Sequence, residues 1–138
     1  MKKVFLDGTW NGSEWRESLI PLLEIDYFNP IVENWTPSDH ERELKEREEC
    51  DFVLYTITPR MMGCYSIAEV VDDSNKRPEK TILCILNIDY DEDEDEELEW
   101  PESQVQSLVY VAEIVDKNGG KVFASLEEVA DYLNSNKN

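Results

Sequence analysis

Five short apolar segments, rich in β-branched and aromatic residues, recur along the chain with longer polar segments between them. They are KVFLD (3–7), IDYFNP (25–30), DFVLYTI (51–57), TILCILNI (81–88) and KVFAS (121–125). Alternation of this kind is typical of βαβ units, which build a parallel sheet through right-handed crossovers. The sequence therefore predicts an α/β fold: a three-layer sandwich with a five-stranded parallel sheet, of flavodoxin-like or Rossmann-like type.

The polar segments carry helix signals. Residues 13–23 predict a first helix that Pro21 must kink or end early. Residues 38–50 predict a second, charged helix, in which Ser38 and Glu41 have the spacing of a capping box. A third helix is expected to begin near Ser66.

Two further helices are expected near the C-terminus. Residues 103–118 predict one that ends at Gly119 and Gly120. The last opens with a capping box from Ser125 to Glu128 and has apolar residues at helical spacing, namely Leu126, Val129, Ala130 and Leu133.

The length of 138 residues predicts a single domain, residues 1–138. No apolar run approaches the ~20 residues that a membrane helix needs, so no membrane partner is expected. The first apolar run ends at Asp7 with no cleavage site after it. We therefore expect a cytoplasmic protein.

Charge and cysteine content exclude several classes of function. The net charge of -19 argues against nucleic-acid binding, which requires clustered Lys and Arg. A bound phosphate would have to be held mainly by backbone N–H groups and hydroxyls. The cysteines Cys50, Cys64 and Cys84 form no CxxC pair, so neither a disulfide framework nor a zinc site is indicated. We expect no cofactor and no metal.

Residues 89–100, DYDEDEDEELEW, contain nine acidic residues in twelve. Such a block repels itself and is usually a solvated, mobile loop. Binding of Ca²⁺ or Mg²⁺ is the alternative, but the segment lacks the glycine and the ligand spacing of an EF-hand.

In open α/β sheets, ligands bind at the carboxyl ends of the strands, where the strand order reverses. The first strand ends in DGTWNGS (7–13) and the third in TITPRMMGCYS (56–66). The first segment is either a βα turn with a helix cap or a polar cradle for a sugar or phosphate. It does not match GxGxxG or the P-loop pattern.

Glu69 is a single acid in the small and apolar run MMGCYSIAEVV (61–71). It lies three residues after Ser66, which is capping-box spacing. Alternatively, it lies in the first helical turn at the carboxyl edge of the sheet, ionised with help from the helix dipole yet poorly hydrated. That second environment suits a nucleophile that attacks an oxocarbenium-like sugar carbon.

Three segments together resemble the nucleoside 2-deoxyribosyltransferase-like family. They are VFLDGTW followed by WR, then FNPIVENW, then EREECDFVLYTITPRMMGCYSIAE, and they extend from about Lys3 to Leu86. The most specific part is the strand-end Thr58 and Pro59, followed by a glycine turn, Ser66 and Glu69. The resemblance implies that Glu69 attacks C1′ of a nucleoside or nucleotide, releases the base and forms a glycosyl-enzyme ester.

The resemblance also implies roles for other residues. Asp7, Gly8 and Thr9 would line the site, with Asp7 orienting or protonating the leaving base. Many members have an Asp six residues before the nucleophile that binds the sugar 5′-hydroxyl, and here that position is Gly63. A 5′-phosphate held by amides near Gly63, Tyr65 and Ser66 would avoid placing two anions together.

Trp10, Trp15 and Trp35 are candidates for stacking on the base. Packing of helix against sheet is the alternative for Trp15, and Trp35, in a loop after an Asn-Pro pair, is the stronger candidate. His40 is expected on the exposed surface of the charged helix. Asp72 and Asp73 are expected to cap or solvate the third helix.

These observations predict an enzyme that cleaves an N-glycosidic bond or transfers a 2-deoxyribosyl group, with a small-molecule nucleoside or nucleotide as its partner. Water as acceptor would make it a hydrolase, and a second base would make it a transferase. Two alternatives remain: a non-catalytic module of the same fold that binds a nucleotide-derived ligand, and an acidic interaction protein that uses residues 89–100. The resemblance further implies a homo-oligomer.

Overall fold

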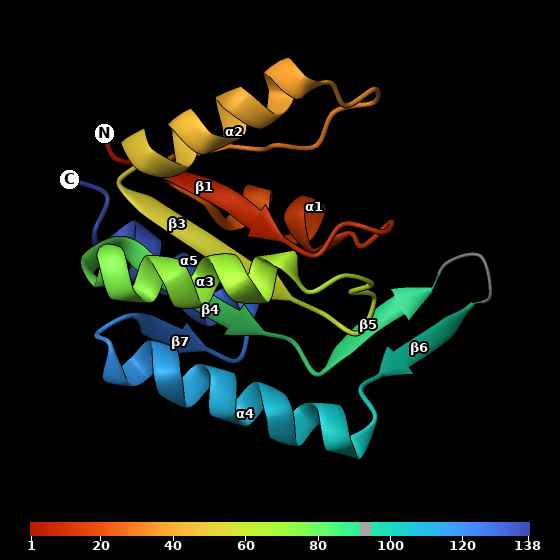
Figure 1. Ribbon diagram of the computed structural model, residues 1–138. Coiled ribbons are helices and arrows are strands. Elements are labelled where there is room, and N and C mark those ends of the chain that lie inside the picture. Colours follow the sequence, from red (N-terminus) through yellow and green to blue (C-terminus); the bar gives the residue numbers. More distant parts are fainter. Residues whose placement is uncertain (92–94) are drawn as a thin grey trace.

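The computed structural model describes residues 1–91 and 95–138, and its centre is a five-stranded sheet (Figure 1). The strands are β1 (Lys3–Gly8), β2 (Asp26–Phe28), β3 (Phe52–Ile57), β4 (Thr81–Ile85) and β7 (Lys121–Phe123). They are all parallel, in the order β2-β1-β3-β4-β7. The predicted parallel sheet is confirmed. The order reverses between β1 and β3, because the chain adds β2 on one side of β1 and the later strands of this sheet, β3, β4 and β7, on the other.

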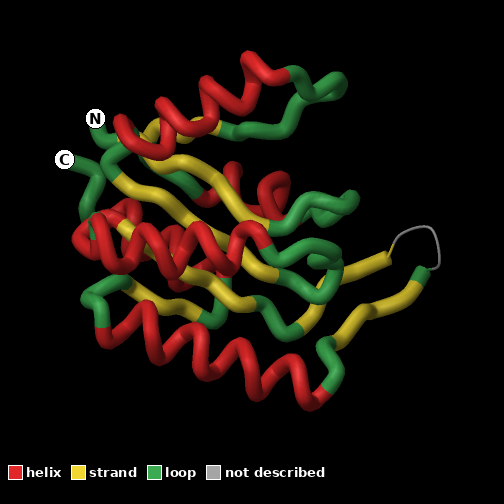
Figure 2. Tube along the Cα trace, in the orientation of Figure 1, coloured by secondary structure: helices red, strands yellow, loops and turns green. Residues whose placement is uncertain are grey.

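Helices cover both faces of this sheet (Figure 2). Helices α1 (Trp15–Leu19) and α5 (Leu126–Ser135) pack on one face, and α2 (Pro37–Glu49), α3 (Tyr65–Lys76) and α4 (Glu102–Lys117) lie on the other. All six residues of β3 are buried, as expected for a central strand covered on both faces. The predicted three-layer α/β sandwich is therefore confirmed.

Local signals at the helix ends were partly predicted. Helix α1 ends after five residues and continues as the 3-10 turn η1 (Ile20–Leu22), which contains Pro21, so the expected early stop is confirmed. The Ser125 hydroxyl accepts a hydrogen bond from the Glu128 backbone N–H, which confirms Ser125 as the cap of α5.

The predicted capping box of α2 was wrong. The helix is capped by Thr36 and Asp39, two residues before the predicted pair. Pro37 explains the difference, because proline is favoured at the first helical position, where its missing N–H costs nothing.

The acidic segment also differs from its prediction as a loop. Strands β5 (Ile88–Asp91) and β6 (Glu96–Glu99) pair antiparallel and extend away from the sheet (Figure 1), while residues 92–94 lie outside the described residues. The Asp89 carboxylate accepts hydrogen bonds of 2.5 Å from the hydroxyls of Ser13 and Thr58. One acid of the block thus joins the hairpin to the loops that follow β1 and β3.

Candidate active site

A cavity of about 390 Å³ opens at the carboxyl end of β1, where the strand order reverses. Its walls come from β1, α2, α3 and the loops after β1 and β2, and the lining residues are Phe5, Asp7, Gly8, Trp10, Trp35, His40, Glu43, Leu44, Arg47, Tyr65, Ser66 and Glu69. Open α/β sheets bind their ligands at this position. The fold therefore brings together Asp7 and Glu69, which are far apart in the sequence.

Glu69 is the fifth residue of α3 and is not a helix cap. The helix begins at Tyr65 and its N-cap is Cys64. The third helical position, where a capping box has its Glu or Gln, is therefore occupied by Ile67. The Glu69 side chain is 12% exposed, and its Oε2 lies 3.4 Å from Nη1 of Arg47. The glutamate is thus free of a capping role and is oriented by a guanidinium.

Arg47 is itself held by a buried carboxylate. Its Nε and Nη2 donate to the two oxygens of Asp73, at 3.0 and 2.9 Å, in a bidentate arrangement. Asp73 also accepts from the Tyr55 hydroxyl at 2.5 Å and from Nε of Arg77 at 2.7 Å. The expectation that Asp73 caps or solvates the helix was wrong. It is fully buried and accepts four hydrogen bonds. Two of them come from the Arg47 guanidinium, which is thereby held in place facing Glu69.

Burial in the cavity favours the protonated forms of Asp7 and Glu69. Burial, and then the nearby Asp7 charge, raise the pKa of Glu69 to about 8, although Arg47 opposes the shift. Burial likewise raises the pKa of Asp7 to about 6, opposed by the Gly8 N–H, which donates to its Oδ1 at 2.7 Å. Because the two carboxyls interact, the values belong to the pair. Between them, the two groups hold about one proton near neutral pH.

Gly8 shapes the end of β1. Its φ is +121°, and a Cβ there would lie 2.2 Å from the backbone oxygen of Thr56, so only glycine fits. The next residue, Thr9, is buried, and its hydroxyl accepts from the Thr58 N–H. Gly8 lines the cavity, whereas Thr58 does not: its hydroxyl is bonded to Asp89.

Four aromatic side chains line the cavity: the buried Phe5, and Trp10, Trp35 and Tyr65, which are exposed at its rim. Trp35 is 51% exposed, and its Nε1 donates to Glu43 at 3.2 Å. Trp15 instead belongs to the core, where its Nε1 donates to the Thr9 carbonyl, so the packing alternative is confirmed. Trp10 and Trp35 are thus placed where stacking on a ligand is possible.

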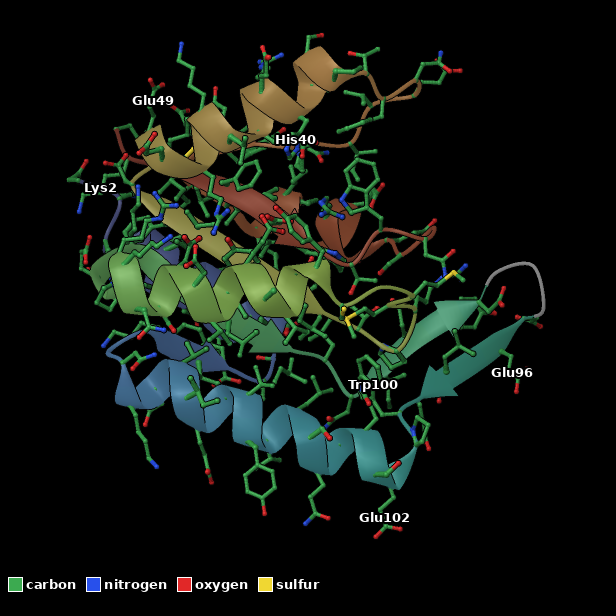
Figure 3. All side chains as sticks on the ribbon, viewed as in Figure 1. Lys2, His40, Glu49, Glu96, Trp100 and Glu102 are labelled. Carbon is green, nitrogen blue, oxygen red and sulfur yellow. The ribbon has the colours of Figure 1, made fainter. Side chains whose placement is uncertain are left out.

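Sequence reasoning missed the contribution of α2. His40, Glu43, Leu44 and Arg47 recur at three- and four-residue spacing, and this one face of the helix lines the cavity. Figure 3 shows His40 on the side of α2 that faces β1. The expectation of an exposed surface histidine was wrong, since His40 is only partly exposed and its ring lies 5.9 Å from that of Trp35. The spacing of these four residues could have indicated a cavity-lining face. The many charged residues of the helix instead favour the interpretation of a solvated helix.

A smaller hollow of about 220 Å³ adjoins the cavity and shares Gly8, Trp10, Tyr65 and Ser66 with it. Gly63 lines this hollow, and a Cβ built on Gly63 meets no atom within 4 Å. Thr9 is a further lining residue, and the hollow contains no carboxylate among its walls. The predicted residues Gly63, Tyr65, Ser66 and Thr9 therefore come together beside the start of α3.

Neither a metal site nor a membrane-spanning helix finds support among residues 1–91 and 95–138. In this part of the chain, no three His, Cys, Asp or Glu side chains are grouped so that they could hold a metal ion. No helix among the same residues combines the length and apolarity needed to span a membrane. The three cysteines are free thiols.

Fold and cavity together define a class of protein: a flavodoxin-like α/β sheet with a helix glutamate and a strand aspartate in one aromatic-walled cavity at its switch point. The family model described as "Nucleoside 2-deoxyribosyltransferase like" matches residues 1–88, well over half of the chain. The chain belongs to this family. The match includes every residue that lines the cavity. No curated protein matches the chain.

Proposed function

We propose that the protein cleaves or transfers the N-glycosidic bond of a nucleoside or nucleotide through a covalent ester on Glu69. The observation that carries the proposal is the position of Glu69: a poorly hydrated carboxyl beside Arg47, in one cavity with a second carboxyl and aromatic walls. The family supports a nucleoside as the substrate class.

The first chemical step forms a bond from a Glu69 carboxylate oxygen to C1′ of the sugar and breaks the bond from C1′ to the base nitrogen. The electron pair of the broken bond goes to the base, and the proton of Asp7 neutralises it. In the second step, water or another base attacks C1′ and the ester bond breaks. Asp7 takes up the proton that this nucleophile releases, and both carboxyls return to their initial states.

The single proton of the pair suits this division of roles. At rest the proton lies mainly on Glu69, whose pKa is the higher of the two. Chemistry requires that this proton pass to Asp7, and Arg47, 3.4 Å from Glu69, favours the transfer because it stabilises the ionised form of Glu69. The position of Arg47 depends in turn on its bidentate contact with Asp73. Arg47 is therefore a positioning residue for the nucleophile, although it lines the cavity itself.

In this proposal, the base and the 5′ end of the substrate occupy the cavity and the smaller hollow, respectively. The base would lie in the larger cavity beside Trp10 and Trp35, with C1′ at Glu69. The 5′ end would point into the smaller hollow, where Gly63 leaves space and the start of α3 offers backbone amides. A 5′-phosphate is compatible with this hollow, because no acid lines it.

The test is incubation with deoxynucleosides, ribonucleosides and their 5′-monophosphates, followed by chromatography for free base. We expect release from at least one of them and no release by Glu69→Gln. The matched control is Glu46→Gln, which changes an acid on α2 that pairs with Lys3 at 2.9 Å and does not line the cavity. Mass spectrometry of quenched wild-type protein should detect the glycosyl ester on Glu69.

The binding-module alternative is kept because Gly63 replaces an acid that many relatives have. Glu69→Ala separates the two possibilities. For an enzyme, base release is lost while ligand affinity survives; for a binding module, neither the wild type nor the variant releases base. The implied homo-oligomer stays a prediction, and sedimentation analysis of the purified protein is the measurement for it.

A further inference from the structure

The charges that line the cavity are unbalanced. Asp7, Glu43 and Glu69 contribute three carboxyls from three different elements, against the single guanidinium of Arg47. That guanidinium is shared with Asp73, which binds it through two hydrogen bonds. The other nearby arginine, Arg16, does not line the cavity: its Nε and Nη1 donate to backbone carbonyls in the core, and its guanidinium carbon lies 6.0 Å from the Trp10 ring centroid, behind the cavity wall. The cavity thus has more anionic than cationic groups facing a ligand.

The aromatic walls add an independent preference. Trp10, Trp35 and Tyr65 approach the cavity from two loops and from the start of α3, and Trp35 is oriented by its bond to Glu43. Aromatic ring faces carry partial negative charge and attract cations, and cages of several rings are a recurrent site for quaternary nitrogen. Rings and carboxyls therefore favour the same kind of ligand.

We infer that the preferred substrates are nucleosides or nucleotides whose base carries a fixed positive charge, such as a pyridinium base. The charged ring would lie among Trp10, Trp35 and Glu43, with the sugar directed toward Glu69. This inference rests on the function proposed above for the same site, and it names the substrate class within that function.

The chemistry of such a substrate fits the groups present. Attack of Glu69 on C1′ forms the ester and breaks the bond to the pyridinium nitrogen. The electron pair that returns to this nitrogen neutralises its charge, so the base departs neutral and needs no proton. The positive charge passes to the sugar in the transition state, beside the carboxyl of Asp7. Asp7 then acts only as the base that activates the incoming nucleophile.

Proton release supplies a second signature of a cationic ligand. The groups facing the ligand are Asp7 from β1, Glu43, His40 and Arg47 from α2, and Glu69 and Tyr65 from α3. A bound cation lowers the raised pKa values of Asp7 and Glu69, because it stabilises their ionised forms. Binding near neutral pH should therefore release protons, whereas binding of a neutral ligand should release fewer.

The experiment is calorimetric titration of the wild-type protein with 1-methylnicotinamide and with 3-methylbenzamide. The two molecules have the same shape and differ in the positive ring nitrogen, and neither has a glycosidic bond that could be cleaved. We expect the cation to bind about tenfold more tightly or better, because contacts with several rings and with carboxyls add. Repeating the titration in buffers of different ionisation enthalpy measures the released protons.

Variants locate the preference in the cavity. Trp35→Leu and Glu43→Gln should each reduce the preference for the cation several-fold. Both side chains lie at the partly exposed rim of the cavity, so the fold should survive these changes. The control is Tyr110→Leu, which removes an exposed aromatic ring from α4, outside the cavity, and should leave the preference unchanged.

The outcomes distinguish this inference from the proposed function. Equal affinities, or a preference for the neutral molecule, would overturn the inference even if neutral nucleosides are cleaved. A cation preference that depends on Trp35 and Glu43, with no base released from nicotinamide riboside or any other nucleoside, would support the binding site and overturn the enzymatic function. Base release from nicotinamide riboside that exceeds release from neutral nucleosides, together with the cation preference, would support both.

Discussion

The proposed activity should depend on pH through the ionisation of Asp7 and Glu69. With a neutral base as leaving group, the pair must lose one proton to ionise Glu69 and keep the other for the base. The rate kcat/KM should therefore rise with pH through about 6 and fall through about 8, the values to which burial raises the two pKa values. For a pyridinium base, which needs no proton to depart, the fall at alkaline pH should be absent. A rate that stays flat across this range would contradict the paired roles.

Because Glu69 is buried, its ionisation at alkaline pH destabilises the folded protein. The folded protein keeps a proton on Glu69 up to about pH 8, whereas the unfolded chain releases it near the ordinary value of 4.5. The folded state binds more protons in this window, so the free energy of unfolding falls as pH rises. Glu69→Gln should remove part of this fall, and its melting temperature should exceed that of the wild type near pH 8 but not near pH 5. Glu46→Gln is the comparison outside the cavity, and an equal gain there would assign the effect to net charge.

The proposed role of Gly63 can be tested by introducing the Asp that the family resemblance implies at this position. A Cβ at this position meets no atom within 4 Å, so Gly63→Asp should fold normally. The new carboxylate would face the 5′ end of the substrate, accepting a hydrogen bond from a hydroxyl and repelling a phosphate. We expect kcat/KM to shift toward free nucleosides relative to 5′-monophosphates, by about tenfold or more. Gly63→Asn is the neutral control, and an identical shift in both variants would exclude a charge effect.

Between elements, α2 and α3 are joined by the Arg47 and Asp73 pair. Asp73→Ala would leave a buried guanidinium without its bidentate partner and should destabilise the fold by about 3 to 5 kcal/mol. Asp72→Ala is the matched change one residue away. Its carboxylate is 44% exposed and lies 3.4 Å from Arg47, so the expected loss is below about 1 kcal/mol. Chemical denaturation measures both, and equal losses would contradict a special role for the buried pair.

Elements buried on both faces could be predicted from the sequence, and elements defined by tertiary contact could not. The apolar runs of β1 and β3 identify central strands because such runs are stable only between two covered faces. The hairpin of β5 and β6 was missed because its acidic composition hides the strand pattern, and because the Asp89 carboxylate is bound by hydroxyls of two distant loops. Arg47 was missed for the same reason, since its partner Asp73 is 26 residues away.

At the scale of the whole molecule, the net charge of -19 should attract cationic ligands. Raising the ionic strength from about 20 to about 500 mM shortens the Debye length and screens this attraction. We expect the affinity for 1-methylnicotinamide to fall several-fold over this range, while the affinity for 3-methylbenzamide changes little. Equal responses of the two ligands would show that the charge of the protein does not act on the site.

All the residues that line the cavity precede residue 70, and the arginine and aspartate that support them precede residue 78. Strand β7 forms the edge of the sheet farthest from β2, and the buried side chains of α4 and α5 belong to the two hydrophobic cores and do not line this cavity. Apolar packing accepts many alternative sequences of similar volume. A site with the proposed chemistry should accept few. Natural selection on this chain is therefore expected to be uneven. Relatives should diverge most after Ile88, and they should be recognised by residues 1–88.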